Sequence, residues 1–188
     1  MRNHLIYFIE VIFLIFKKIE SYVNSLYHEI KRINVRGVLC FGGGFLIVGV
    51  ISWILCIKNA YLASFYVFPR CALPFFYAHV AWAISFFFVG VIFGGILLGC
   101  EKFKRRYSVK IAFFLAFTYL FSLCAHPIFF GKLSPFLAFI VLLASFLFCL
   151  LTIIASIKAF KLWTICLFVQ LFWLIYNLYT ALAFSFVN

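Results

Sequence analysis

The chain has 188 residues, of which 68% are hydrophobic and 23% aromatic, and its mean hydropathy is +1.21. A soluble domain is nearer half apolar, so this composition excludes a soluble globular protein and indicates an integral membrane protein. The formal charge of +12 resembles that of a nucleic-acid-binding protein. Because the basic residues follow the membrane topology predicted below, we expect no nucleic-acid partner.

The N-terminal residues 1–35 are predicted to form an amphipathic helix that lies on the inner membrane surface. The apolar run Leu5–Phe16 is too short to span a membrane and contains Glu10. A signal peptide is the competing interpretation because Arg2 precedes this run, but Glu10 inside it argues against cleavage. From Lys17 onward, apolar residues recur at helical spacing. They are Ile19, Val23, Leu26, Ile30 and Ile33.

Residues 36–188 contain five apolar runs that are long enough to cross a membrane. About 20 helical residues, at a rise of about 1.5 Å each, span a hydrocarbon core of about 30 Å. The runs do not alternate in polarity as barrel strands do, so we expect helices. The predicted fold class is an all-α membrane protein, a five-transmembrane-helix bundle with an extra N-terminal helix. The expected spans are 38–57, 72–99, 111–130, 135–157 and 162–187.

The basic residues predict the orientation of these spans. Of the sixteen Lys and Arg residues, all but Lys58, Arg70 and Lys132 fall on one side of the predicted membrane. The positive-inside rule therefore places the N-terminus inside and the C-terminus outside. We expect a multi-pass protein of a bacterial membrane whose basic side also attracts anionic lipids.

Glycines cluster in the first two spans. Gly42, Gly43 and Gly44 lie in the first span, and Gly90 and Gly94 lie four residues apart in the second. Small residues at this spacing let helix backbones approach closely, so we expect them to pack inside the bundle. The same spacing could mark the face of a homodimer, and the sequence does not choose between these two interpretations.

Few polar side chains interrupt the spans, and most lie toward the predicted outer side. His79 and Trp82 are three residues apart on one face of the second span. His126 lies near the outer end of the third span, and Asn177 in the outer half of the fifth. Polar groups are expensive in hydrocarbon, so they suggest a pocket beneath the 58–71 loop. The alternative is that they only form hydrogen bonds between helices.

The sequence contains few of the residue patterns that enzymes use for catalysis. There is no Asp, and no HExxH motif, nucleophile–base set or phosphate-binding glycine loop is present. We therefore expect no catalytic residues, no metal site and no required cofactor. All four Glu residues fall on the predicted inner side, away from the histidines: Glu10, Glu20, Glu29 and Glu101.

Several short motifs follow the pattern of one family. Pro69 and Leu73-Pro74 precede Trp82 with the spacing of Lys-Pro, Pro-Pro and Val-Trp. Ala125–Gly131, which reads AHPIFFG, matches a Trp-Pro-Pro-Ile-Phe-Phe-Gly stretch, and Asn177 matches a Leu-Asn asparagine. On these residues the chain resembles the translocator protein family (TspO/MBR, tryptophan-rich sensory proteins, peripheral-type benzodiazepine receptors). The resemblance implies five transmembrane helices with a ligand pocket beneath the loop between the first two.

Other family positions differ in this chain. Leu62 stands for a loop tryptophan and Phe68 for a loop lysine. Val141 stands for a fourth-helix aspartate, and Val169 and Ala181 stand for fifth-helix tryptophans. The family's tryptophan-lined pocket is therefore expected to be largely lined by Phe and Leu here.

The resemblance implies a receptor or carrier that binds, and as a carrier transports, tetrapyrroles such as porphyrin and haem or other flat hydrophobic ligands. One alternative is a non-enzymatic scaffold or regulator that acts through its basic N-terminal helix. A porphyrin-degrading membrane enzyme is the other. We further expect His79 or His126 to contact a tetrapyrrole through its propionate or metal. The predicted ligand-binding residues are Leu62, Pro69, Pro74, His79, Trp82, Phe86, His126, Pro127 and Asn177.

Overall fold

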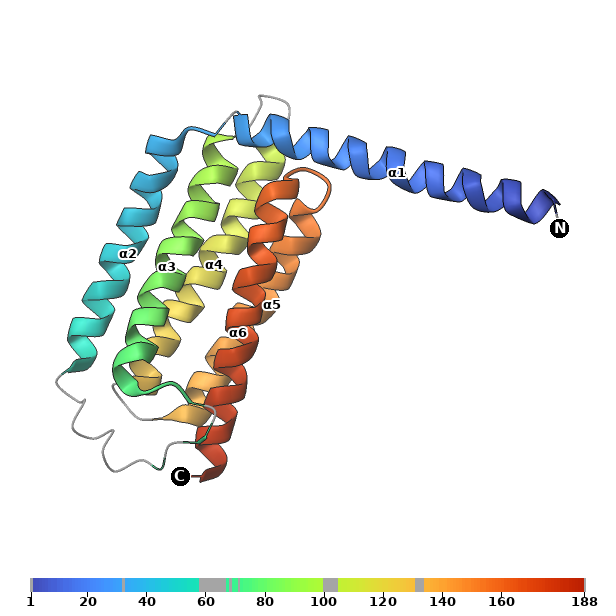
Figure 1. Ribbon diagram of the computed structural model, residues 1–188. Coiled ribbons are helices and arrows are strands. Elements are labelled where there is room, and N and C mark those ends of the chain that lie inside the picture. Colours follow the sequence, from blue (N-terminus) through green and yellow to red (C-terminus); the bar gives the residue numbers. More distant parts are fainter. Residues whose placement is uncertain are drawn as a thin grey trace.

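The computed structural model describes residues 2–31, 33–57, 67, 69–70, 72–99, 105–130 and 134–187 (Figure 1). Five of its helices are long and apolar enough to cross a membrane, which confirms the predicted all-α membrane bundle. The described helices are α1 (Arg2–Lys31), α2 (Val35–Ile57), α3 (Phe75–Leu98), α4 (Arg105–Phe130), α5 (Pro135–Ser156) and α6 (Lys161–Val187).

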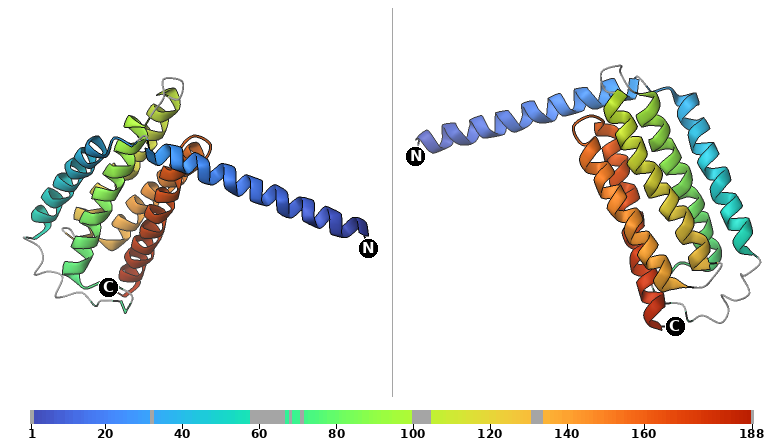
Figure 2. Two further views of the ribbon diagram at one scale, coloured as in Figure 1. Left: turned by 45° about the horizontal axis from the view of Figure 1, so that its top comes forward. Right: turned by 180° about the vertical axis from the view of Figure 1, so that it is seen from behind.

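Helices α2 to α6 run side by side in alternating directions, as Figures 1 and 2 show. Helix α2 packs mainly on α3, α4 on α5, and α5 on α6, while α3 also contacts α4 and α6. Helix α1 projects sideways from one end of this bundle, which we call the α1 end, and contacts α6. The chain terminates at the other end, which we call the C-terminal end.

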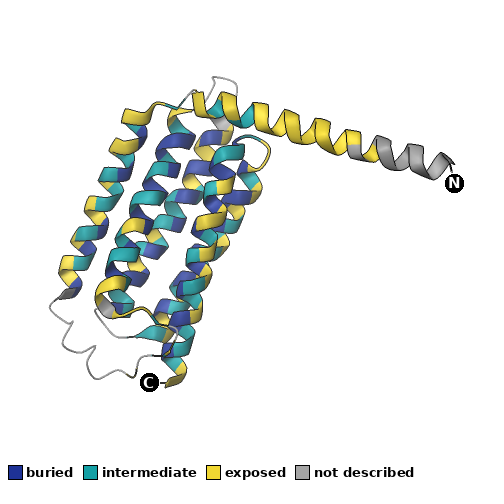
Figure 3. Cartoon of the chain, in the orientation of Figure 1, coloured by how far each residue is buried: buried dark blue, intermediate teal, exposed yellow. Residues whose placement is uncertain are grey.

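Buried residues gather where the helices face one another, and exposed residues lie on the outside of the bundle (Figure 3). Many of the exposed residues are large and apolar. Phe86, Ile92 and Ile96 on α3 are at most 1% exposed, whereas Phe172 on α6 is 70% exposed. An apolar exterior is expected of helices that face lipid, because lipid tails are as apolar as the side chains they meet.

The predicted glycine packing is confirmed at the contact between α2 and α3. A side chain on Gly90 would collide with the Phe41 carbonyl and the Gly42 backbone, and one on Gly49 would collide with the Phe86 ring. By contrast, nothing lies within 4 Å of the place where a side chain on Gly43 would begin. Gly42, Gly49 and Gly90 therefore let these helices lie close together, whereas the predicted packing is wrong for Gly43 and for Gly44, which also has nothing within 4 Å.

The starts of three helices differ from the predicted spans by three residues or more, and the ends of α3 and α5 and the start of α6 differ by one residue. Helix α2 begins at Val35 instead of 38 because Asn34 accepts a hydrogen bond from the Gly37 N–H and caps its first turn. Helix α3 begins at Phe75 instead of 72, since the residue before Pro74 is disfavoured in a helix. Helix α4 begins at Arg105 instead of 111, because its polar first turns carry no hydropathy signal.

Candidate functional site

A buried polar network joins α2, α3 and α4 toward the C-terminal end. His79 Nδ1 lies 2.9 Å from His126 Nε2, and the other ring nitrogen of His126, Nδ1, lies 3.0 Å from Ser52 Oγ. Cys56 Sγ lies 3.8 Å from the same nitrogen. His79 and His126 are each 1% exposed. We call Ser52, His79 and His126 the histidine network. Their mutual hydrogen bonds satisfy polar groups whose burial without a partner in hydrocarbon would cost free energy.

Aromatic rings enclose the histidine network. Trp53 stacks on His79 with ring centroids 5.8 Å apart, and Phe130 lies 4.4 Å from the same ring. Trp82 lies 5.3 Å from the His126 ring. These contacts give the imidazole rings apolar neighbours, so the network also holds Trp82 and Phe130 in place.

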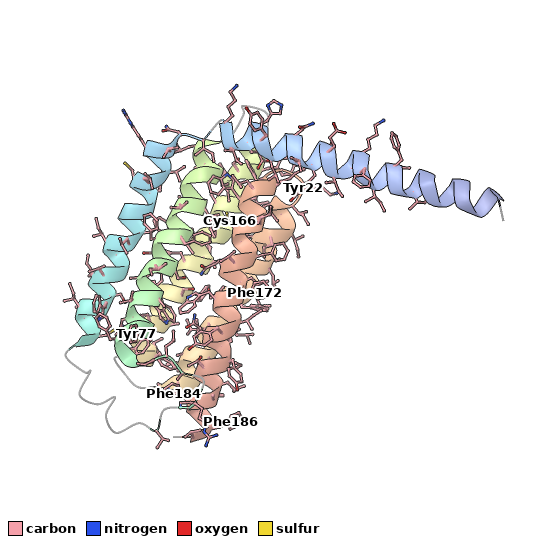
Figure 4. The ribbon with its side chains drawn as sticks, viewed as in Figure 1. Tyr22, Tyr77, Cys166, Phe172, Phe184 and Phe186 are labelled. Atoms are coloured by element: carbon pink, nitrogen blue, oxygen red, sulfur yellow. The ribbon has the colours of Figure 1, made fainter. Side chains whose placement is uncertain are left out.

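A small aromatic cavity lies beside Trp82 and Phe130 on the side away from α2. Its volume is about 30 Å³, which is enough for a water molecule, since a cavity needs roughly 10–15 Å³ to hold one. Asn177 and Thr180 contribute polar side chains to its wall. Figure 4 shows Phe184, one of its lining residues, near the C-terminal end of α6. We call this space the tryptophan cavity; its rings come from Trp82, Phe129, Phe130, Trp173, Tyr176 and Phe184.

The segment Ala72–Pro74, immediately before α3, covers the tryptophan cavity. The Ala72 N–H donates to the Pro69 carbonyl at 2.9 Å and closes a turn. The Leu73 N–H donates to the Tyr176 hydroxyl at 3.0 Å, and both Ala72 and Leu73 line the cavity. Trp173 stacks on Tyr176 with ring centroids 5.5 Å apart. The cover segment is therefore fastened to the aromatic wall on α6.

Other polar side chains bond the helices to one another. Ser85 and Gln170 exchange hydrogen bonds of 3.0 and 3.1 Å between α3 and α6. Ser122 and Ser145 lie 2.7 Å apart across α4 and α5. Asn177 instead donates to the carbonyl of Trp173 in its own helix. Gln170 therefore bonds between helices, whereas the Asn177 amide nitrogen bonds within α6 at the cavity wall.

No family model, curated protein or solved structure matches this chain. The site is therefore interpreted from its own residues.

The structure brings together four of the predicted site residues. His79, Trp82, Phe86 and His126 form one cluster of ring contacts. Asn177 shares the wall of the tryptophan cavity with Trp82. His79 and His126 do not line that cavity; they lie behind Trp82 and Phe130.

Three other predicted residues, Pro69, Pro74 and Pro127, do not line the tryptophan cavity. Pro69 precedes the cover segment, and Pro74 is its last residue, directly before α3. Pro127 lies inside α4, which continues to Phe130, so this proline does not end the helix. Leu62 lies outside the described residues.

Residues that sequence reasoning missed complete both the network and the cavity. Ser52 was missed because a serine in an apolar span usually bonds to its own helix, yet here it meets a histidine on α4. Trp173 and Tyr176 carried a signal, because Trp173 lies three residues after Gln170 and four before Asn177. That spacing places Gln170, Trp173 and Asn177 near one face of α6.

The bonds made by His126 bear on what the histidines can do. Both of its ring nitrogens already face partners, Ser52 and His79, so ligation of a haem iron by His126 would break one of these bonds. Within the described part of the chain, no three His, Cys, Asp or Glu side chains are grouped so that they could hold a metal ion. The described geometry favours a positioning role for the network behind the aromatic wall.

Proposed function

We propose that this protein is a multi-pass membrane receptor or carrier that binds a flat hydrophobic ligand, of the porphyrin or haem class, in the tryptophan cavity. The support is the wall itself, where large rings surround a few polar groups from Asn177 and Thr180. Aromatic walls with few orienting polar groups suit flat apolar molecules. The resemblance to the translocator protein family points to the same ligand class and to the same end of the bundle.

The size of the tryptophan cavity sets a condition on this proposal. Drug-sized ligands occupy pockets of roughly 300–1,000 Å³, and the cavity measures about 30 Å³. A porphyrin therefore requires the cover segment to lift from α6. The hydrogen bond from the Leu73 N–H to the Tyr176 hydroxyl is one contact that must break. A bond of this kind contributes about 0.5–1.5 kcal/mol, so it is a modest barrier to opening.

The histidine network has a positioning role in this proposal. His126 and His79 pack against Trp82 and Phe130, which form the part of the wall nearest the network. Their hydrogen bonds fix where these two rings stand. Ligand affinity is then sensitive to the network even though the histidines lie behind the wall.

A porphyrin titration of the full chain in detergent tests the proposal, followed by the Soret band. Replacing Trp173 by Leu removes one ring of the wall, so we expect affinity to fall about tenfold, or about 1.4 kcal/mol. The matched control is Phe172→Leu, one residue away and 70% exposed toward lipid. Equal affinity in wild type and Trp173→Leu would contradict the proposal.

A second candidate function is a scaffold that acts through α1. The observation that favours it is the exposed apolar surface of this projecting helix, with Phe13 and Phe16 exposed by 70% and 67%. A photo-crosslinking amino acid at Phe16, activated in native membranes, separates the two functions. A discrete protein adduct that depends on Phe13 supports the scaffold, whereas lipid adducts alone support a helix that only lies on the membrane surface.

A further inference from the structure

A second, larger cavity lies at the α1 end, far along the bundle from the tryptophan cavity. Its volume is about 340 Å³. Its apolar lining includes Val38, Phe160 and Trp163, and its polar lining includes Ser25 and Glu29 of α1. We call it the α1 cavity. It therefore combines an apolar floor on the bundle with a polar roof on α1.

The floor of the α1 cavity depends on a glycine. A side chain on Gly95 of α3 would occupy the position of the Trp163 ring, so the absence of one lets the indole lie against the helix. Trp163 is 7% exposed and Phe160 is 4% exposed. The cavity thus has an ordered aromatic base, which could meet the upper part of a lipid tail or glycerol backbone.

The roof is held in place by Glu29. Its two carboxylate oxygens accept hydrogen bonds from the backbone N–H groups of Lys161 at 3.1 Å and Leu162 at 2.9 Å. These N–H groups belong to the N-terminus of α6, where a negative charge is favourable. Lys161 Nζ also lies 4.8 Å above the Tyr22 ring, and Figure 4 shows Tyr22 beside this end of α6. Both contacts fasten the last turns of α1 to the bundle.

The charge that lines the α1 cavity comes from α1. Glu29 is the acidic residue among the described residues of the lining, and the imidazole of His28 lies beside it in the sequence and also lines the cavity. A carboxylate has about four acceptor sites, so Glu29 can accept further hydrogen bonds besides those from α6. The lining thus favours a cationic donor.

We propose that the α1 cavity binds the headgroup of an aminophospholipid, with its primary ammonium toward Glu29. Glu29 offers acceptors to the ammonium, and the apolar floor of Val38, Phe160 and Trp163 offers contacts to the glycerol backbone and the upper acyl chains. A primary ammonium donates three hydrogen bonds, whereas a quaternary ammonium donates none. The lipid comes from the leaflet along which the amphipathic α1 lies, since a helix of this type rests at the headgroup level.

Lipid binding to the delipidated full chain tests this inference, measured by native mass spectrometry with short-chain lipids. We expect phosphatidylethanolamine to bind about tenfold more tightly than phosphatidylcholine, the effect of a hydrogen bond to a charged group. Phosphatidylglycerol, which lacks the ammonium, should also bind more weakly. Equal retention of the three lipids would overturn the proposal, as would free glycerophosphoethanolamine competing as well as the lipid.

Two variants locate the binding. Ser25→Phe fills the cavity from α1 while leaving Glu29 in place, and it should abolish the preference for phosphatidylethanolamine. The matched control is Ser21→Phe, one helical turn earlier on α1, where Ser21 is exposed and is not a lining residue. Glu29→Gln should reduce the preference for primary over quaternary ammonium. A preference that survives in Ser25→Phe would overturn the assignment to this cavity.

Discussion

The two ends of the bundle differ in how they use polar side chains. At the C-terminal end, His79 and His126 bond to one another and stand behind an aromatic wall, and the adjacent cavity measures about 30 Å³. At the α1 end, Glu29 bonds to backbone groups at a helix terminus and lines a cavity of about 340 Å³. Polar residues deep in the spans therefore mark a closed, tightly bonded region, whereas the polar residue at the α1 end borders a larger cavity.

The difference follows from what each polar group has for partners. A side chain inside a span can reach only other side chains or carbonyls of the helices, so neighbouring helices pack around the bond. Glu29, near the end of α1, lies beside the first residues of α6. The N–H groups of a helix's first turn have no partner within the helix, so they can bond to Glu29 without close packing of the two helices. The following substitutions test this difference between the two ends, and we give them in order of decreasing expected effect.

Replacing His126 by Ala tests the closed region most severely. It removes the hydrogen bonds to Ser52 and His79 and leaves a void beneath Trp82, so we expect the free energy of unfolding to fall by about 2–4 kcal/mol. Thermal unfolding in detergent measures this loss. The control is Leu120→Ala on the same helix, which is 49% exposed and should change stability much less. Equal losses in the two variants would contradict a structural role for the histidine network.

Replacing Gly95 by Ala tests the open region. The added methyl group meets the Trp163 ring and forces it toward the α1 cavity, and overpacking of this kind costs about 1–3 kcal/mol. Thermal unfolding should report this cost, and phosphatidylethanolamine binding should weaken with it. Gly43→Ala serves as the control, because a side chain there begins in open space. An unchanged melting temperature in Gly95→Ala would show that the ring does not rest against α3.

Replacing Tyr176 by Phe is the mildest of these changes. It removes the hydroxyl that accepts the Leu73 N–H and leaves the ring stacked on Trp173. Opening of the cover segment should become easier by about 0.5–1.5 kcal/mol, so porphyrin should bind up to about tenfold more tightly. Tyr179→Phe on the exposed face of α6 provides the comparison. Weaker porphyrin binding in Tyr176→Phe would mean that the hydroxyl contacts the ligand instead.

Much of the fold could be predicted from the sequence, because hydropathy over about 20 residues is a strong signal. The first turns of α4 were missed because Arg105 and Lys110 are helical without being apolar. The grouping of His79, Trp82 and His126 followed from helical spacing and alternating topology. Helical spacing determines which residues share a face, and the alternating direction of the helices determines at which end of the bundle a residue lies. Both inferences succeed wherever the helices are regular.

The α1 cavity had no such signal. Glu29 meets Lys161 and Leu162 across more than a hundred residues of chain, and nothing near Glu29 in the sequence indicates that contact. The hydrogen-bond partner of Ser52 could not be predicted either, because it depends on how α2 and α4 pack. The volume of a cavity is likewise a property of packing, so the size of the tryptophan cavity could not be predicted from the sequence.

Hydrogen exchange in the presence of a porphyrin tests whether the ligand enters the closed end by lifting the cover segment. Exchange is measured on the full chain with and without saturating porphyrin. We expect faster exchange at the Leu73 amide, which loses Tyr176 as its acceptor, and no change at the Lys161 and Leu162 amides held by Glu29. Unchanged exchange at Leu73 together with a change at Lys161 and Leu162 would contradict this expectation and move the ligand to the α1 end.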